Sequence, residues 1–333
     1  MPAYRSLFAK RIGISTVTPQ RKQLTIVHLS LLFTAMLWGG NFTALKYLLG
    51  HLKPIDTLLI RVGGAALFFL ILLMLNRRPR TPLTRPDLLR FFGLGIIGIS
   101  IMNIAFVFGQ SMIPATLASL VVTSNPIHTA IISRVLGNEP LTSRKIGGIA
   151  LAMAGFLIVL FYGSPGGASL AGGEIKGMLV IAIGPFSWAF YTVLSKPMLT
   201  RYSPIETASY TCIAGAIGLL PLLFIDPGAV GRVAGMSGHA WLAAFYLAAF
   251  GFVLAYILWY RGLQILTPSQ TAVYIYLVPV FGLLCAWLIL DEQITRYIIL
   301  GAATILAGVI LTNTTRSVKT QSISSRQSAA VGR

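Results

Sequence analysis

Leu136-Gly137-Asn138-Glu139-Pro140-Leu141 closes one long apolar stretch and opens the next, and Leu288-Ile289-Leu290-Asp291-Glu292-Gln293-Ile294 does the same later in the chain. Residues around the first junction recur around the second at a constant distance of 153 positions. A common offset held across roughly thirty residues indicates an internal duplication. Because each copy joins apolar stretches, the repeated unit itself is predicted to span a membrane. The recurring residues are Pro126, Glu139, Gly148 and Gly155, which return as Pro279, Glu292, Gly301 and Gly308.

The composition predicts an all-α integral membrane protein. Apolar residues make up 56% of the 333 residues and charged residues only 10%, whereas a soluble domain carries about 25% charged residues. A bilayer core needs about 20 apolar residues per helix, and ten stretches of about that length predict ten transmembrane helices. The predicted cores are 24–47, 55–75, 88–112, 115–136 and 146–162 in the first half, and 177–194, 206–225, 240–258, 271–290 and 296–311 in the second.

The basic residues predict the orientation of the chain in the membrane. With the N-terminus in the cytoplasm, twenty Lys and Arg residues fall on the cytoplasmic side and five on the other, with Arg61 left inside a helix. Both termini are therefore predicted to be cytoplasmic. The net charge of +18 then reflects topology, and no nucleic-acid partner is expected.

Five helices per copy is an odd number, so the second copy must enter the membrane from the opposite side. The predicted organisation is a cytoplasmic N-terminal segment 1–23, a first repeat 24–163, a second, inverted repeat 174–313 and a disordered cytoplasmic tail 314–333. Inverted repeats with a site near the midplane are a recurrent architecture of secondary transporters. In this arrangement Glu139 and Glu292 are expected to pin loops on opposite faces, away from the substrate.

The sequence does not point to enzyme chemistry. Cys212 and Cys285 are isolated in apolar surroundings, and the four histidines are widely separated, so we expect no catalytic residue, no metal and no cofactor. All eight acidic residues lie at helix ends or in loops, which disfavours proton-coupled export of cationic drugs. Gly93-Leu94-Gly95-Ile96-Ile97-Gly98 matches a dinucleotide fingerprint but lacks the preceding strand, and is interpreted as a packing face of small residues.

Trp38-Gly39-Gly40-Asn41-Phe42-Thr43-Ala44-Leu45-Lys46 ends the first predicted helix and recurs loosely as Trp188-Ala189-Phe190-Tyr191-Thr192-Val193-Leu194-Ser195-Lys196. With Arg61 after Pro54 and with Ser124-Asn125-Pro126, these motifs resemble the drug/metabolite transporter superfamily, specifically its EamA-type ten-helix metabolite exporters. The resemblance covers about residues 26–315. It implies a multi-pass carrier in the cell inner (plasma) membrane that moves amino acids or related compounds outward. It also implies that the fifth helices of both copies lie away from the pathway, where a homodimer contact could form.

Polar and aromatic residues inside the predicted helices are the candidates for substrate binding. A polar side chain in hydrocarbon is costly unless it faces a cavity or a partner helix. The alternative is that these aromatic residues form interfacial belts and the polar ones join helices. The candidates are Trp38, Asn41, Asn103, Thr123, His128, Trp188, Tyr191, Tyr274 and Tyr276.

Four further residues are given separate roles. Arg61 is a candidate charge partner that either binds an anionic substrate group or makes a structural ion pair, and Lys46 either faces the cavity or extends to the membrane surface. Pro126 and Pro279 are candidate gates, because a proline inside a helix breaks a hydrogen bond and permits a kink. Static kinking is the alternative for both prolines.

The predicted function is a secondary transporter that exports small metabolites by alternating access through a central cavity between the two repeats. Amino acids or related compounds are the leading substrate class, and the expected partners are this small-molecule substrate and the lipid bilayer. A nucleotide-sugar or sugar-phosphate carrier, favoured if Arg61 and Lys46 face the cavity, and a multidrug exporter are the alternatives. A membrane-embedded enzyme acting on lipid is a remote one.

Overall fold

The computed structural model describes residues 19–76, 80–113, 118, 121–136, 139–162, 175–282, 284 and 296–313. All regular structure within these residues is helical, which confirms the all-α prediction for this part of the chain. The first half contains α2 (Pro19–Leu49), α3 (Pro54–Leu75), α4 (Arg85–Gly95), the π-helical η1 (Ile96–Ile101), α5 (Met102–Met112), α7 (Asn125–Val135) and α8 (Ser143–Tyr162). The second half contains α9 (Ile175–Ser195), η2 (Lys196–Thr200), α10 (Pro204–Leu219), α11 (Leu222–Ile225), α12 (Ala229–Ala234), α13 (Gly238–Phe245), the π-helical η3 (Tyr246–Leu254), α14 (Ala255–Ile265), α15 (Pro268–Ala272), η4 (Val273–Leu277) and α17 (Arg296–Asn313).

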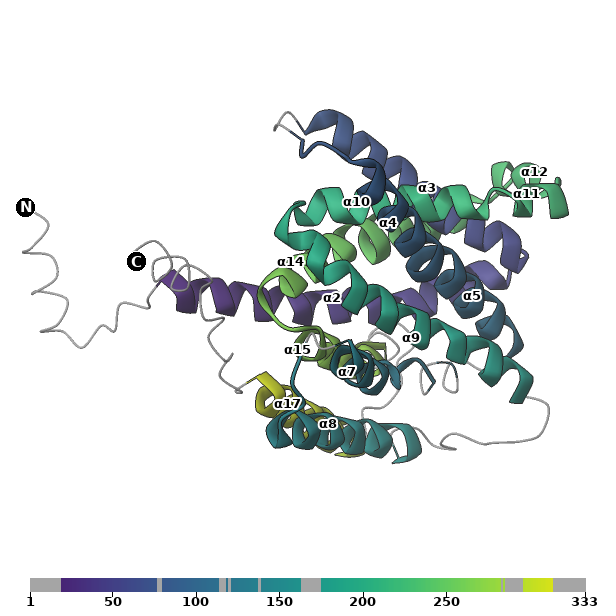
Figure 1. Ribbon diagram of the computed structural model, residues 1–333. Helices are drawn as coiled ribbons and strands as arrows, with labels where there is room; N and C mark the ends of the chain where they lie inside the picture. The colour runs from purple at the N-terminus through teal and green to yellow at the C-terminus, as the bar shows by residue number, and fades with distance from the viewer. Residues whose placement is uncertain are drawn as a thin grey trace, which may run out of the picture.

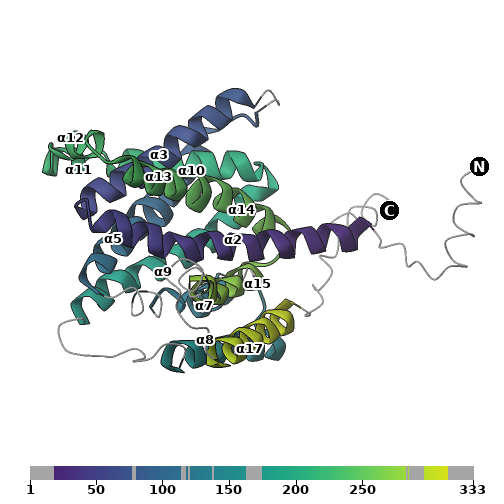
Figure 2. The same ribbon diagram turned by 180° about the vertical axis from the view of Figure 1, so that it is seen from behind.

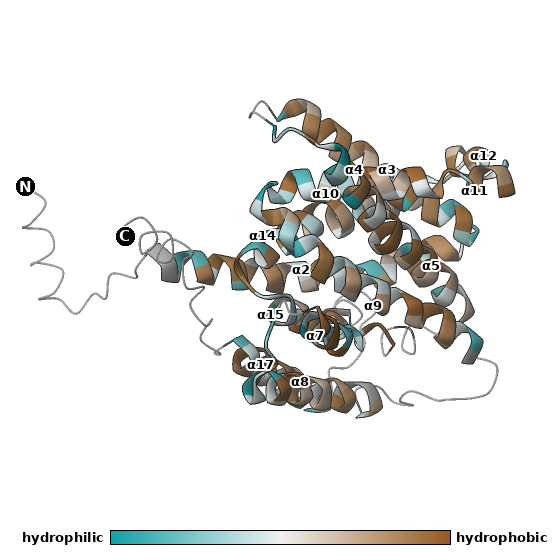
Figure 3. Ribbon diagram, in the orientation of Figure 1, coloured by the Kyte–Doolittle hydropathy of each residue, from teal (hydrophilic) through white to brown (hydrophobic). Residues whose placement is uncertain are grey.

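Many of these helices are long and apolar enough to cross a membrane. Within the described residues there are six such segments, and residues 299–313 form a shorter apolar helix. Apolar residues predominate along α3, α8 and α17 (Figure 3), and many of their large side chains are exposed on the outside of the protein. The total of ten helices, the domain boundaries and the orientation of the termini stay predictions. The six segments are Lys22–Leu49, Pro54–Leu75, Arg85–Met112, Lys176–Thr200, Pro204–Ile225 and Gly238–Ile265.

The second helices of the two halves begin in the same way, which reflects the duplication. Pro54 and Pro204 each occupy the first turn, where a missing N–H costs nothing. Two residues later a carboxylate accepts a hydrogen bond from the backbone N–H just before the proline: Asp56 from Lys53 at 3.1 Å and Glu206 from Ser203 at 2.8 Å. Both helices therefore begin with the same pattern of a proline and a carboxylate, 150 positions apart.

The two halves interlock, because several helices of one half pack against helices of the other. In the first half α2 contacts η3 and α14, and in the second half α9 contacts η1 and α5. The second helices, α3 and α10, contact each other and also the third helix of the opposite half. Both third helices contain a π-helical segment at a corresponding place. This set of contacts is unchanged when the halves are exchanged, as expected for a pseudo-twofold arrangement.

The fifth helices, α8 and α17, lie side by side at the edge of the protein, as Figures 1 and 2 show. Their glycines make this close approach possible: a Cβ added to Gly155 would lie 2.7 Å from the carbonyl oxygen of Gly301, and one added to Gly148 would lie 2.8 Å from that of Gly308. The repeated glycines of the fifth helices are therefore used for packing within one chain. A homodimer stays a prediction.

Candidate functional site

A cavity of about 90 Å³ lies between the two halves of the protein. Its walls come from α2, α3, α5 and α7 of the first half and from α9, α14 and η4 of the second. The lining residues are Trp38, Asn41, Phe42, Arg61, Met102, Phe106, Val122, Asn125, Gly184, Pro185, Trp188, Tyr256, Ile275 and Val278.

Much of this lining consists of equivalent residues from the two halves. Trp38 pairs with Trp188 and Phe106 with Tyr256, each 150 positions apart, and Val122 with Ile275 and Asn125 with Val278, each 153 apart. These are the same offsets as in the duplicated sequence. A cavity lined by four such pairs lies on the pseudo-twofold axis between the halves.

Aromatic rings form one continuous wall of the cavity. The ring centroids of Trp38 and Trp188 are 5.5 Å apart at an interplanar angle of 85°, and Tyr256 lies 5.2 Å from Trp188. Trp259 lies behind them, 5.1 Å from Trp38 and almost fully buried. The Trp38 indole N–H donates to the carbonyl oxygen of Gly251 at 3.0 Å, which fixes the orientation of its ring. This wall suits a flat or apolar solute.

Two amide side chains also lie at the cavity, and both bond to backbone of the second half. Asn41 donates to the carbonyl oxygen of Gly251 at 3.5 Å, and Asn125 donates to that of Pro185 at 2.7 Å. Asn125 also accepts a hydrogen bond from Thr129 at 3.2 Å. These contacts join α2 to η3 and α7 to α9 across the boundary between the halves.

Of the predicted substrate-binding residues, Trp38, Asn41 and Trp188 line the cavity, and so does the candidate charge partner Arg61. Lys46 is exposed and does not line it. The other six predicted residues lie outside the lining: Asn103, Thr123, His128, Tyr191, Tyr274 and Tyr276.

Hydrogen bonds and packing contacts elsewhere in the protein account for the positions of several of these six. Asn103 bonds back to the Ile99 carbonyl oxygen at 2.7 Å. The Tyr191 hydroxyl lies 2.9 Å from that of Thr211, and the Tyr274 hydroxyl lies 2.6 Å from Nδ1 of His28. His128 packs edge-on against Phe186.

Phe106 and Tyr256 are lining residues that sequence reasoning did not select. Phe106 carries no polar atom, and Tyr256 lies in an apolar helix without a motif. Their equivalence at an offset of 150, the same as that of Trp38 and Trp188, is the signal that could have found them.

Regular α-helix is interrupted just before each of the two prolines named as gates. Thr123 and Ser124 form a turn ahead of Pro126, and the 3₁₀ segment Val273–Leu277 ends shortly before Pro279. Proline lacks the N–H that would bond four residues upstream, and the residues at that position, Val122 and Ile275, both line the cavity. The two helix breaks therefore lie beside the cavity. That they move as gates stays a prediction.

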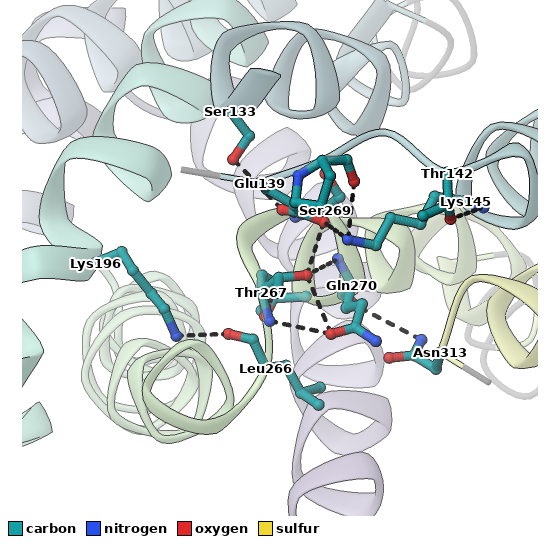
Figure 4. Close-up of polar contacts among 12 residues, drawn as sticks. Ser133, Glu139, Thr142, Lys145, Lys196, Leu266, Thr267, Ser269, Gln270 and Asn313 are labelled. Atoms are coloured by element: carbon teal, nitrogen blue, oxygen red, sulfur yellow. Dashed lines mark hydrogen bonds and ion pairs between the residues drawn. The ribbon is translucent and has the colours of Figure 1, made fainter. Parts of the chain in front are cut away.

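On the face predicted to be cytoplasmic, a buried carboxylate joins the two halves (Figure 4). Glu139 is 1% exposed and lies 2.6 Å from the ammonium of Lys145. It also accepts hydrogen bonds from the hydroxyl of Thr267 at 2.8 Å and from the backbone N–H of Ser269 at 3.0 Å. We call Glu139, Lys145, Thr267 and Ser269 the Glu139 cluster.

Other polar contacts between the halves lie on the same predicted face. Asp87 at the start of α4 accepts from Arg201 at 2.6 Å and from the Tyr202 hydroxyl at 2.8 Å. Glu206 accepts from the backbone N–H of Thr81 at 3.0 Å. Within the second half, Lys196, the first residue of η2, donates to the carbonyl oxygen of Leu266 at 2.7 Å beyond the C-terminus of α14, where a helix favours positive charge.

On the opposite predicted face, Arg232 joins two carboxylates. It donates to both oxygens of the buried Asp56 at 2.7 Å and to Asp226 at 2.7 Å, and Lys53 lies 3.5 Å from Asp226. We call Asp56, Asp226 and Arg232 the Arg232 cluster. Like Glu206, the equivalent residue Asp56 thus contacts the segment between the second and third helices of the other half.

The contribution of Asp226 to stability should be insensitive to pH across the physiological range. The hydrogen bond and the charge of Arg232 hold the pKa of Asp226 below its ordinary value of 3.8. A lowered folded-state pKa contributes stability above the unfolded value and loses it as pH falls through the folded value. We therefore expect Asp226→Asn to lower the thermal midpoint by a constant amount between pH 8 and pH 5, and by less as pH falls below 3.8. A difference that has already vanished at pH 5 would contradict this.

Two larger hollows in the described part of the protein have a different character. Each has a volume of about 410 Å³ and lies between α3 and helices of the second half. Only apolar side chains and glycines line both of them. They suit acyl chains better than a polar solute.

Comparison with known proteins agrees with this architecture. The chain is 28% identical over 287 residues to the uncharacterized transporter YyaM of Bacillus subtilis, covering 85% of this chain and 92% of that protein. It is 29% identical over 291 residues to a probable amino-acid metabolite efflux pump of Escherichia coli, covering 84% and 92%. It is 27% identical over 289 residues to a probable terminal-alkyne amino-acid exporter of Streptantibioticus cattleyicolor, covering 85% and 92%.

One solved crystal structure, described only as a protein, has the same fold. It superposes with a TM-score of 0.69 at 20% identity and covers 89% of this chain and 98% of its own. The model of the EamA-like transporter family matches the sequence twice, over residues 25–161 and 175–314. With most of its length matched in two copies, this chain belongs to the EamA-like transporter family, and it is a multi-pass membrane protein.

Proposed function

We propose that this protein exports amino acids or related small metabolites across the cell inner membrane by alternating access through the central cavity. The observation that carries the proposal is the paired lining, in which equivalent residues of the two halves face one space. Two inverted copies can exchange their conformations, so that the cavity opens first to one side and then to the other. A cavity on the pseudo-twofold axis stays in contact with both halves throughout such an exchange.

The polar clusters on the two faces fit the role of alternating closures. The Glu139 cluster and the Arg232 cluster both join one half to the other, and they lie on faces predicted to be opposite. Opening toward either side requires the cluster on that side to separate. Pro126 and Pro279 interrupt the helices beside the cavity, and we propose that these interruptions absorb the change in backbone.

Amino acids remain the leading substrate class. Two relatives at 27% and 29% identity have names that refer to amino-acid export or to efflux of amino-acid metabolites. A sugar-phosphate carrier is the second candidate, since Arg61 lines the cavity, although Lys46 does not. A multidrug exporter of cations is less well supported, because the lining has a positive charge and no carboxylate.

Counterflow in liposomes tests the proposal. The purified protein is reconstituted and loaded with unlabelled amino acids, and uptake of labelled amino acids is compared with that of labelled sugar phosphates. We expect amino-acid counterflow. Counterflow of sugar phosphates with no amino-acid signal would contradict the substrate class, and no counterflow of any solute would contradict transport by this route.

The same assay tests the position of the pathway. Trp188→Ala removes a ring from the cavity wall, and we expect it to lower the counterflow rate roughly tenfold, corresponding to the loss of about 1.4 kcal/mol of interaction. Trp241→Ala is the matched control, because Trp241 is 43% exposed and lines an outer apolar hollow. Equal effects of the two substitutions would remove the central cavity from the pathway.

A further inference from the structure

Arg61 breaks the twofold pattern of the cavity. It lies seven residues after Pro54, and the residue seven positions after Pro204 in the other half is Thr211. The Thr211 hydroxyl bonds to the Tyr191 hydroxyl at 2.9 Å and to the Thr207 carbonyl oxygen at 2.8 Å, and it does not line the cavity. One half therefore places a cation at the shared cavity and the other half does not.

Among the described residues, the buried guanidinium of Arg61 has no partner of opposite charge. Its side chain lies two turns into α3, about 10 Å from the helix start at 1.5 Å per residue, and the residue is only 5% exposed. Within the described residues, neither Nε nor Nη1 has a hydrogen-bond acceptor. The rings of Phe106 and Phe252 lie 5.3 Å and 5.7 Å from the guanidinium carbon. Ring faces attract a cation, but they do not replace acceptors for five N–H groups in a planar fork.

The carboxylates of the described chain are all engaged elsewhere. The described residues include five carboxylates, and each accepts hydrogen bonds from other residues. None of the five forms an ion pair with Arg61. Glu174, Asp291 and Glu292 lie outside the described residues. The structural ion pair that the sequence left open for Arg61 therefore has no partner among the described residues. The five are Asp56, Asp87, Glu139, Glu206 and Asp226.

The remaining lining is suited to the body of an organic acid. Trp38, Trp188 and Tyr256 supply a flat apolar wall, and the amides of Asn41 and Asn125 both donate to backbone carbonyls. Among the described residues, the lining contains no carboxylate that could balance a substrate ammonium group. A planar guanidinium fork matches a carboxylate in a two-bond arrangement.

We propose that Arg61 binds the carboxylate of the transported solute, and that this carboxylate is the required recognition group whereas an amino group is dispensable. The inference rests on the proposed transport function and names its substrate class: small organic acids with an apolar or aromatic body, including amino acids. Solutes that carry only a positive charge are excluded, because they would meet the guanidinium inside a cavity without a compensating anion.

Binding to the full-length protein in detergent tests the proposal with four probes that share one ring. These are 3-phenylpropionate, L-phenylalanine, the neutral 3-phenylpropanamide and the cation phenethylamine. Fluorescence of the tryptophans reports binding, since Trp38 and Trp188 line the cavity. We expect the two carboxylates to bind at least tenfold more tightly than the amide and the amine. Arg61→Gln should bring the four affinities to within about twofold of one another, and Arg61→Lys should retain part of the preference.

Arg261→Gln is the matched control, because it removes the same charge from an exposed position at the far end of α14. It should leave the carboxylate preference unchanged. If Arg61 serves only to pack against Phe106 and Phe252, Arg61→Gln would weaken all four probes by the same factor, and that result would overturn the proposal. Binding of the acid and its amide with equal affinity, or of no probe at all, would overturn it as well.

Counterflow of labelled L-phenylalanine then separates this inference from the proposed function. A carboxylate preference that depends on Arg61 without any counterflow supports the anion site and counts against transport. Counterflow in which the amide or the amine competes as well as the acid leaves transport standing and overturns the anion site.

Discussion

Glu139→Ala is expected to destabilise the protein by about 3–5 kcal/mol, because it leaves the ammonium of Lys145 buried without a counter-charge. The side chains of Glu139 and Lys145 are 0% and 6% exposed and 2.6 Å apart. The substitution also removes the acceptor for the backbone N–H of Ser269 and for the Thr267 hydroxyl, both in the other half. Unfolding in mixed detergent and sodium dodecyl sulfate micelles, followed by fluorescence, measures the change.

A double-mutant cycle separates the charge from the hydrogen bonds. Glu139→Gln keeps an acceptor for Ser269 and Thr267 but leaves Lys145 unpaired, and Lys145→Met leaves Glu139 unpaired. The double variant buries no charge, so it should be more stable than either single variant. If the two single losses simply add in the double variant, the pair is not coupled and the Glu139 cluster does not hold the halves together through charge.

The sequence alone predicted that Glu139 pins a loop, but it did not predict which residues Glu139 contacts. Its place at a junction between apolar stretches predicted a loop position away from the substrate. Besides a hydrogen bond from the nearby Ser133, its carboxylate accepts hydrogen bonds from Thr267 and Ser269, about 130 positions away in the other half. A local pattern does not contain such a contact, because it arises from how the halves interlock. The repeated residue Glu292 lies outside the described residues.

The candidate site was only partly predictable, for a similar reason. Polarity in an apolar helix identified Asn41 and Arg61 at the cavity, but it also selected Asn103 and Tyr276, which lie outside the lining. A polar residue inside the protein can bond within its own helix, as Asn103 does with Ile99. Apolar aromatic rings such as Phe106 give no such signal. The duplication is the better guide, since it places equivalent residues on both sides of one axis.

The glycine motif in the third helix shows how the structure refines a prediction made from the sequence. Gly93, Gly95 and Gly98 were interpreted as one packing face of small residues. A Cβ on Gly95 would lie 2.6 Å from both the backbone nitrogen of Gly215 and the carbonyl oxygen of Thr211, and one on Gly98 would overlap the ring and Cβ of Tyr191. A Cβ on Gly93 would meet nothing within 4 Å. Only two of the three glycines are therefore required by packing.

Substitution by alanine should therefore destabilise the protein at two of these positions but not at the third. Gly95→Ala and Gly98→Ala should each destabilise the protein by about 1–3 kcal/mol, because backbone or a buried ring must shift to make room. Gly93→Ala should be neutral or stabilising by up to about 1 kcal/mol, since alanine favours the helix and meets no neighbour. Unfolding in mixed micelles compares the three variants under one condition.

A rescue experiment identifies the contact that causes the loss at Gly98. Tyr191→Ala removes the ring that an added Cβ would meet, so Gly98→Ala should cost less in that background than in the natural sequence. The loss at Gly95 should be unchanged there, because its neighbours are backbone atoms and the Ala214 Cβ of α10. If all three glycine substitutions destabilise the protein equally, close packing is not the cause. The third helix would then require glycine for its backbone conformation, and not because α4 and η1 approach the other half closely.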